Sequence, residues 1–272
     1  MSSKRGRQPV TEFTLVVQDC LAGMQSLPAQ SVDVVVTSPP YNIGVQYNSY
    51  NDCRSREDYL RWTMYWANEV KRVLKPGGSF FLNLGAIPKN PLVPHELIME
   101  LSNLFVLQNT FHWIKSVSVR QPDGGIISTG HFKPINSRRF VNDCHEFVFH
   151  LTKHGTTPLD RLSLGVPYAD KSNVTRWTHT QGRDVRCGGN VWFIPYETIS
   201  RRQLQRPHPA TFPMQLAVNC IKIHGNAGES VVLDPFMGLG HTALAAKRCG
   251  VRRFIGFDID PEYVELAREK LG

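Results

Sequence analysis

The chain has 272 residues, 41% of them apolar and 20% charged, and this balance excludes a disordered, collagen-like or low-complexity protein. No apolar run approaches the roughly 18 residues that a membrane span needs, and the basic N-terminus has no apolar segment behind it, so we expect a cytoplasmic protein without a membrane segment. The formal net charge of +8 favours a polyanionic partner such as nucleic acid.

The first half of the chain alternates between strand-like and helix-like segments. Runs of β-branched and aromatic residues predict strands, and apolar residues at three- to four-residue spacing predict helices. In chain order we expect a strand at residues 13–17, a helix at 21–27, a strand at 32–36, a helix at 57–74, a strand at 79–84, a helix at 95–103 and strands at 108–114 and 146–151. Strand, helix and strand in turn predict an α/β fold.

The middle of the chain has weak periodicity and is rich in Gly, Pro, Ser, Thr and Arg at residues 121–136 and 156–206. These stretches predict long loops or a small lobe. Between Arg120 and Arg206 there are 13 basic and 7 acidic residues, so this region carries +6 of the net +8.

The C-terminal third is regular again. We expect a helix at residues 213–224, a strand at 230–233, a helix at 241–249, a strand at 253–257 and a helix at 261–271. Asp260 and Pro261 suit the start of the last helix, and Gly250 suits the end of the preceding one.

One loop has the features of a cofactor site. The strand that ends at Asp234 runs into Gly238 and Gly240 and then into a helix, in a G-x-G-x-x-A pattern; we call residues 234–240 the glycine loop. Glycine lets the backbone approach a ligand, and the helix start offers free N–H groups. Asp258 ends the next strand and can accept hydrogen bonds from ribose hydroxyls. The pattern favours an adenosine-containing cofactor and leaves S-adenosylmethionine and NAD both open.

A second loop, Ser38-Pro39-Pro40-Tyr41, follows a buried strand. The prolines fix the direction of backbone carbonyls, so a carbonyl and the serine hydroxyl can point at one amino group. An exocyclic amine on a base is a poor nucleophile because its lone pair is delocalised into the ring. Fixed oxygens that accept its protons localise that pair, and Tyr41 can stack on the base. Together with the glycine loop, this favours methyl transfer to an amine. The six cysteines and the histidines have no metal-ligand spacing, so no metal is expected.

With these motifs, the sequence resembles the S-adenosylmethionine-dependent DNA amino-methyltransferases of bacterial restriction-modification systems, in the order of their β group. The resembling stretches are residues 18–21, 31–42, 74–79, 145–147, 208–213 and 234–242. The resemblance implies a Rossmann-like methyltransferase fold: a circularly permuted, mostly parallel seven-stranded sheet whose last two strands lie beside the first two, with a small DNA-recognition lobe. Double-stranded DNA and S-adenosylmethionine are the implied partner and cofactor, and a homodimer stays open.

The resemblance also implies residue roles. Ser38, Pro39, Pro40 and Tyr41 would hold a flipped base, with Pro39 offering its carbonyl. Asp234, Phe236, Gly238 and Gly240 would hold the methionine part of the cofactor, Asp258 its ribose, Asp19 with Cys20 its adenine, and Thr211 with Phe212 would lie on its other side.

The first residue of the tetrapeptide bears on the target base. By similarity, serine there is typical of cytosine-N4 enzymes, whereas Asp or Asn is commoner in adenine-N6 enzymes, which remain the alternative. A carbon-5 cytosine enzyme would need a cysteine after proline, and none of the six cysteines follows one. An NAD-linked oxidoreductase and a non-catalytic DNA-binding homologue are the alternatives of other classes.

The chain is expected to divide in function. Residues 1–153 and 207–272 would form the catalytic and cofactor-binding domain, and residues 154–206 the target-recognition region, with the loop 120–139 contributing. The candidate phosphate contacts are Arg138, Arg139, Arg176, Arg183, Arg186, Arg201 and Arg202, with Trp177 and His179 between them.

Overall fold

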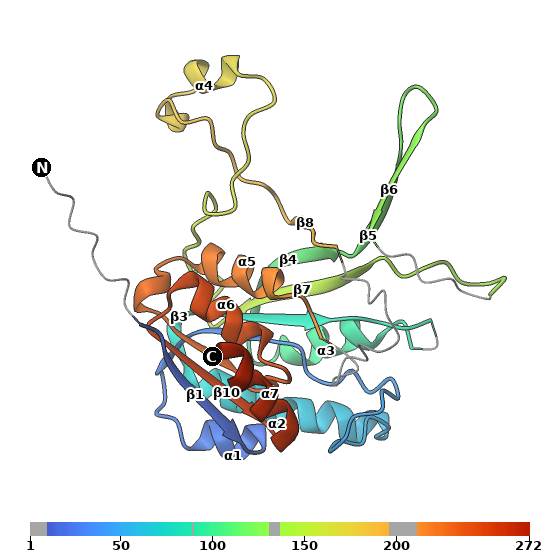
Figure 1. Ribbon diagram of the computed structural model, residues 1–272, viewed down its shortest axis with the longest axis vertical. Coiled ribbons are helices and arrows are strands. Elements are labelled where there is room, and N and C mark those ends of the chain that lie inside the picture. The colour runs from blue at the N-terminus through green and yellow to red at the C-terminus, as the bar shows by residue number, and fades with distance from the viewer. Residues whose placement is uncertain (1–9, 89, 131–136, 196–210) are drawn as a thin grey trace, which may run out of the picture.

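The computed structural model describes residues 10–88, 90–130, 137–195 and 211–272. Its centre is one sheet with the strand order β1-β10-β9-β2-β3-β7-β4-β8 (Figure 1). The strands are β1 (Glu12–Val17), β2 (Val32–Thr37), β3 (Leu74–Leu84), β4 (Val106–Ile114), β7 (His145–Thr152), β8 (Val191–Phe193), β9 (Val231–Asp234) and β10 (Arg253–Asp258).

The sheet is mostly parallel, as expected. All neighbours from β1 to β3 pair in parallel, β7 runs antiparallel to β3 and β4, and β8 is parallel to β4. The last two strands, β9 and β10, lie between β1 and β2, which confirms the permuted order. The sheet has eight strands where seven were expected. The extra strand, β8, is three residues long and has no readable alternation inside a segment that the sequence presented as loop.

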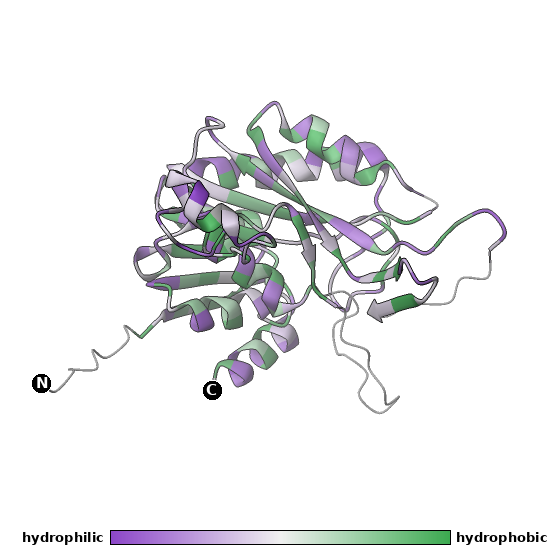
Figure 2. Cartoon of the chain, turned by 90° about the horizontal axis from the view of Figure 1, so that it is seen from above, coloured by the Kyte–Doolittle hydropathy of each residue, from purple (hydrophilic) through white to green (hydrophobic). Residues whose placement is uncertain are grey.

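Helices cover both faces of the sheet (Figure 1). They are α1 (Cys20–Gln25), α2 (Arg56–Val73), α3 (Val93–Leu101), α5 (Met214–His224), α6 (His241–Cys249) and α7 (Pro261–Leu271). The side chains of consecutive strand residues point to opposite faces of the sheet. Phe80 belongs to the hydrophobic core on the side of α1 to α3, and Phe81 to the core on the side of α5 to α7. The helices therefore carry both hydrophobic and hydrophilic residues around their circumference (Figure 2).

The predicted helix ends are confirmed. Asp260 accepts hydrogen bonds from Glu262 N and Tyr263 N at the start of α7, with Pro261 in the first turn. Gly250 ends α6 in the left-handed conformation with φ 64°. Within the described ranges, none of the helices combines the length and apolar character that a bilayer crossing demands.

Two segments project from the sheet (Figure 1). One is the hairpin of β5 (Ser116–Arg120) and β6 (Ile126–Gly130). Within the expected loop 121–136, residues 121–125 form the turn of this hairpin and residues 126–130 are a strand, which corrects the expectation there; residues 131–136 lie outside the described part. The strands of this hairpin are almost wholly exposed, so no burial pattern marks them. The other carries α4 (Ser172–Arg176) and the short helix η1 (Thr178–Thr180) and falls inside the expected lobe.

Candidate active site

A cavity of about 470 Å³ lies where the loops after β1, β2, β9 and β10 leave the sheet. These four strands are parallel, so their carboxyl ends meet at one edge. Eleven of the thirteen predicted site residues line the cavity, namely Asp19, Cys20, Ser38, Pro39, Pro40, Tyr41, Thr211, Phe212, Phe236, Gly238 and Asp258. The Ser-Pro-Pro-Tyr loop and the glycine loop therefore share one space, although most of the chain separates them.

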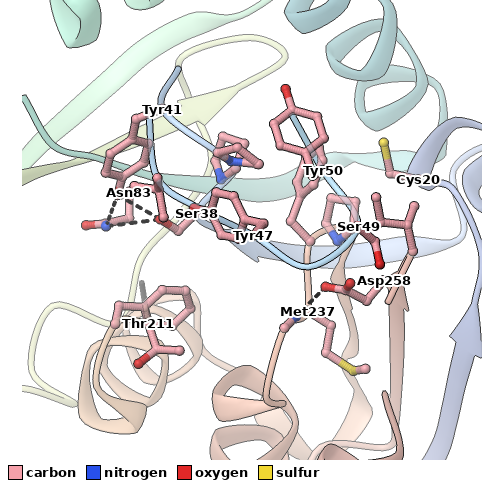
Figure 3. A pocket seen from close by; sticks show the side chains of 18 of the residues that line it. Cys20, Ser38, Tyr41, Tyr47, Ser49, Tyr50, Asn83, Thr211, Met237 and Asp258 are labelled. Atoms are coloured by element: carbon pink, nitrogen blue, oxygen red, sulfur yellow. Dashed lines mark hydrogen bonds between the residues drawn. The ribbon is translucent and has the colours of Figure 1, made fainter. Parts of the chain in front are cut away.

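The cavity has two ends (Figure 3). Ser38, Tyr41 and Asn83 lie together at one end, with Thr211 nearby. Cys20 and Asp258 lie at the other end, and Tyr47, Ser49 and Tyr50, from the segment that follows Tyr41, also line the cavity. This separation suits a ligand with one part beside each loop.

At the end of the cavity that contains Cys20 and Asp258, the Asp258 carboxylate is hydrogen-bonded to the glycine loop. Gly238 N donates to Asp258 Oδ2 at 2.8 Å, and Asp260 N donates to Asp258 Oδ1 at 2.9 Å. Gly238 has φ 50°, a left-handed conformation that glycine adopts without strain. Burial raises the pKa of the Asp258 carboxyl above its ordinary value. Each carboxylate oxygen has a second lone pair, so the group can still accept from a ligand hydroxyl.

The two remaining predicted residues lie off the cavity. Asp234 is buried, and it accepts from Thr37 Oγ1 at 2.6 Å, Thr242 Oγ1 at 2.6 Å and Phe236 N at 3.1 Å. Burial, partly offset by these hydrogen bonds, raises its pKa to about 6. Because Thr37 directly precedes Ser38, Asp234 joins the two loops and does not face the ligand space.

Gly240 supports the same loop from behind. It has φ 76°, and a Cβ there would lie 2.8 Å from Ala267 Cβ on α7. Glycine at this position therefore allows α6 to start close to α7.

At the end of the cavity that contains Ser38, three side chains form a hydrogen-bonded network around the phenol of Tyr41. Ser38 Oγ lies 2.7 Å from Tyr41 Oη, Tyr41 Oη donates to Glu146 Oε2 at 3.1 Å, and Asn83 Nδ2 lies 2.7 Å from both Tyr41 Oη and Glu146 Oε2. Burial and the neighbouring Glu146 raise the pKa of Tyr41 well above its ordinary value, so the phenol stays protonated. The loop itself is anchored by Tyr59 Oη, which donates to Pro40 O at 2.8 Å.

Several lining residues were not predicted. Asn83 and Glu146 come from β3 and β7, and the segment 43–54 contributes Tyr47, Tyr50 and Arg54. That segment is shaped by the buried Asp52, whose carboxylate accepts from the backbone N–H groups of residues 42, 43 and 45 at 2.8 to 3.1 Å. The only sequence signal for Glu146 was its place in the resembling stretch 145–147.

The predicted DNA contacts lie away from the cavity lining. Arg138, Arg139, Arg176, Arg183 and Arg186 are all exposed on the surface. Trp177 and His179 stack on each other in the lobe, with ring centroids 5.5 Å apart. Arg201 and Arg202 lie outside the described residues.

The family model of the N6/N4 DNA methylases matches residues 32–269. The chain belongs to this family. Among curated relatives it is 31% identical to the Type II methyltransferase M.ScaI of Streptomyces caespitosus over 93% of this chain and 79% of that one. It is 26% identical to the DNA adenine methyltransferase YhdJ of Escherichia coli K12 over 95% of this chain and 82% of that one.

Solved structures share the fold. The PvuII DNA methyltransferase, described as cytosine-N4-specific, superposes with a TM-score of 0.68 at 22% identity, over 97% of this chain and 88% of that one. A DNA modification methylase of Thermus thermophilus, TTHA0409, complexed with S-adenosyl-L-methionine, superposes with a TM-score of 0.60 at 26% identity, over 95% and 92% of the two chains. Family membership decides between the two cofactors that the glycine loop left open, in favour of S-adenosylmethionine.

Proposed function

We propose that this DNA methyltransferase transfers a methyl group from S-adenosylmethionine to the exocyclic N4 of cytosine in double-stranded DNA. The observation that carries the proposal is that the Ser-Pro-Pro-Tyr loop and the glycine loop line one cavity. When bound, S-adenosylmethionine supplies an electrophilic methyl group on a sulfonium. The chain has to bring an amine against that methyl and receive its proton.

The cavity fits the cofactor. Its volume of about 470 Å³ is in the range of small-molecule sites. We assign the ribose hydroxyls to the Asp258 carboxylate, the adenine to the neighbourhood of Asp19 and Cys20, and the methionine part to Phe236 and Gly238. Thr211 and Phe212 lie on the other side. Asp234 and Gly240 act indirectly, by holding the glycine loop in place.

The target base belongs at the Ser38 end. In this assignment Ser38 and the Pro39 carbonyl accept hydrogen bonds from the exocyclic amine, and the Tyr41 ring packs on the base. Pro40 keeps the loop rigid through its bond from Tyr59. A base inside a duplex cannot reach this cavity, so the base is flipped out, at a cost of a few kcal/mol that stacking and edge contacts offset.

We propose for the whole chain the division in function that the sequence predicts. We assign residues 1–153 and 207–272 to the catalytic and cofactor-binding domain, and residues 154–206 to target recognition with a contribution from the loop 120–139. The projecting hairpin and the α4 segment support this division, since both stand clear of the sheet (Figure 1). The arginines of these segments supply salt-sensitive phosphate contacts. The named relatives are bacterial, and we place the protein in the cytoplasm.

The deciding experiment identifies the methylated base. Purified protein is incubated with labelled S-adenosylmethionine and duplex DNA, and the product is digested to nucleosides. We expect N4-methyldeoxycytidine from the wild type and no product from Ser38→Ala. N6-methyldeoxyadenosine would establish the alternative, which the adenine-methylating relative YhdJ supports. DNA binding without any methyl transfer would indicate a non-catalytic homologue.

A further inference from the structure

The hydroxyl of Ser38 is the first member of a hydrogen-bonded chain that ends on a carboxylate. Ser38 Oγ lies 2.7 Å from Tyr41 Oη, and Tyr41 Oη lies 3.1 Å from Glu146 Oε2. The other oxygen of Glu146 accepts from Lys115 Nζ at 3.2 Å, with the side chains of Lys115 and Glu146 only 21% and 16% exposed. These hydrogen bonds thus connect the Ser38 hydroxyl to the carboxylate of Glu146, which is itself paired with the ammonium group of Lys115.

The network fixes the direction of every proton in this chain. Asn83 Nδ2 lies 2.7 Å from both Tyr41 Oη and Glu146 Oε2 and 3.4 Å from Ser38 Oγ, so its two protons go to the two nearer oxygens. The opposite amide orientation would bring the Asn83 carbonyl oxygen against the carboxylate, which repels it. An ionised carboxylate only accepts, so the phenol proton of Tyr41 points to Glu146. Ser38 must then donate to Tyr41, and its lone pairs are left for the cavity.

A glycine on β3's C-terminal side, Gly85, leaves space for this network. At Gly85, a Cβ would lie 3.0 Å from Tyr41 Cε2 and 3.1 Å from Glu146 Cδ, closer than most real contacts. A glycine here therefore lets the Tyr41 ring and the Glu146 side chain approach each other. Glu146 lies next to this glycine because β3 and β7 pair antiparallel, with Leu84 opposite Phe147.

We propose that Glu146 is the final acceptor of the proton that the target amine loses, reached through Ser38 and Tyr41. This inference rests on the proposed function, because it requires an exocyclic amine beside Ser38. Glu146 is a positioning residue in this scheme, since it acts through Tyr41 and does not touch the base.

Methyl transfer leaves the amine nitrogen with one proton to lose. As the N–CH₃ bond forms and the S–CH₃ bond breaks, the amine nitrogen takes on the positive charge that sulfur loses. Its N–H bond then breaks: the proton passes to Ser38 Oγ, the Ser38 proton to Tyr41 Oη, and the Tyr41 proton to Glu146 Oε2. Glu146 becomes a neutral carboxylic acid, and it returns the proton to water through the cavity that it lines.

The test uses the full chain with saturating DNA and labelled S-adenosylmethionine, in single turnovers. The variants are Tyr41→Phe, which keeps the ring and removes the hydroxyl, Glu146→Gln, which keeps the shape and removes the charge, and the pair combined. We expect each single variant to slow methyl transfer by about 10²-fold, the lower end of what a positioned proton acceptor contributes. The combined variant should be no slower than the slower single one, because both changes interrupt the same path.

Two further measurements separate proton transfer from a structural role. Affinities for S-adenosylmethionine and for DNA, and the melting temperature, should match the wild type in Glu146→Gln. In Glu146→Ala, added formate should restore the rate in a concentration-dependent way, because formate replaces the carboxylate and not the packing. Glu69→Gln is the matched control and should keep full activity: Glu69 is also paired, with Arg72 at 2.9 Å, and 20% exposed, and it is not among the cavity-lining residues.

The outcomes distinguish this inference from the function it rests on. Full activity in Glu146→Gln, additive losses in the combined variant, or a defect that formate does not relieve would each overturn the proton path while leaving methyl transfer to cytosine intact. A wild-type protein that methylates no exocyclic amine would remove both.

Discussion

A buried histidine makes the stability of this protein depend on pH. His150 on β7 is fully buried, with its ring stacked on Phe81 at a centroid distance of 4.6 Å. Asn109 Nδ2 lies 3.0 Å from its Nδ1, and Ser79 Oγ lies 3.0 Å from its Nε2 and 2.9 Å from His224 Nδ1. The consistent assignment has Asn109 donating to Nδ1, Nε2–H donating to Ser79, and Ser79 donating to His224. This series of hydrogen bonds requires a neutral His150 ring.

Burial, with a smaller effect of His224, lowers the pKa of His150 from its ordinary value of 6.5 to about 4. Between these values the unfolded chain binds a proton at this position and the folded protein does not. The free energy of unfolding therefore falls as the pH drops below about 6.5, at about 1.4 kcal/mol per unit. The loss is about 2 kcal/mol by pH 5 and about 3 kcal/mol by pH 4.

His150→Gln isolates this contribution, because glutamine offers one acceptor and one donor and does not titrate. Urea unfolding followed by circular dichroism at pH 7 and pH 5 gives the loss for each protein. The wild type should lose about 2 kcal/mol more than the variant. Asp234 and Asp258 also have shifted pKa values, but they are present in both proteins and cancel in the difference; His224 shares Ser79 with His150, so the variant reports on this pair of histidines. Equal losses in the two proteins would refute the neutral, buried histidine.

Three other substitutions test the site. Asp52→Asn leaves a single acceptor oxygen for the three backbone N–H groups that follow Tyr41. It should lower the free energy of unfolding by about 2 kcal/mol and weaken S-adenosylmethionine binding, measured by calorimetry. Unchanged binding would show that this segment does not contribute to the cofactor site. Gly85→Ala should crowd the Tyr41 ring and slow methyl transfer about tenfold, with an unchanged circular dichroism spectrum, whereas wild-type rates would show that the ring has room to move. Thr37→Val removes a donor to buried Asp234 and should cost about 1 to 3 kcal/mol in thermal unfolding, a loss that the same substitution at the exposed Thr129 of β6, Thr129→Val, should not reproduce.

The part of the site that the sequence predicted depends on strand ends. Ser38 follows β2, Asp258 ends β10, and parallel strands place their carboxyl ends at one edge, so the loops could be assigned to one cavity without knowing any contact. The motif could not show which of its residues face the ligand. Asp234 and Gly240 belong to the same pattern as Gly238, yet they serve the protein interior.

Glu146 and Asn83 could not be predicted, because their meeting depends on register. Asn83 pairs with Val148 across an antiparallel ladder, and a shift of one residue would turn Glu146 to the other face of the sheet. Periodicity locates strands but does not give the partner or the offset. Other causes hid β8 and the hairpin of β5 and β6: β8 has only three residues, all apolar in sequence, and the hairpin strands are exposed along almost their whole length.

The strand order explains why one buried carboxylate contacts both loops of the candidate site. Because β9 lies directly beside β2, with Leu233 opposite Val35, the residues at the ends of these strands meet across 197 positions of sequence: Thr37 Oγ1 donates to Asp234 Oδ1 at 2.6 Å. Asp234 also accepts from Phe236 N in the glycine loop. The Ser-Pro-Pro-Tyr loop and the glycine loop are therefore tied to one carboxylate. In the proposed reaction, a methyl donor and an amine held by separate loops must meet within a fraction of an ångström, and the shared contacts with Asp234 would set the distance between these loops before either ligand binds.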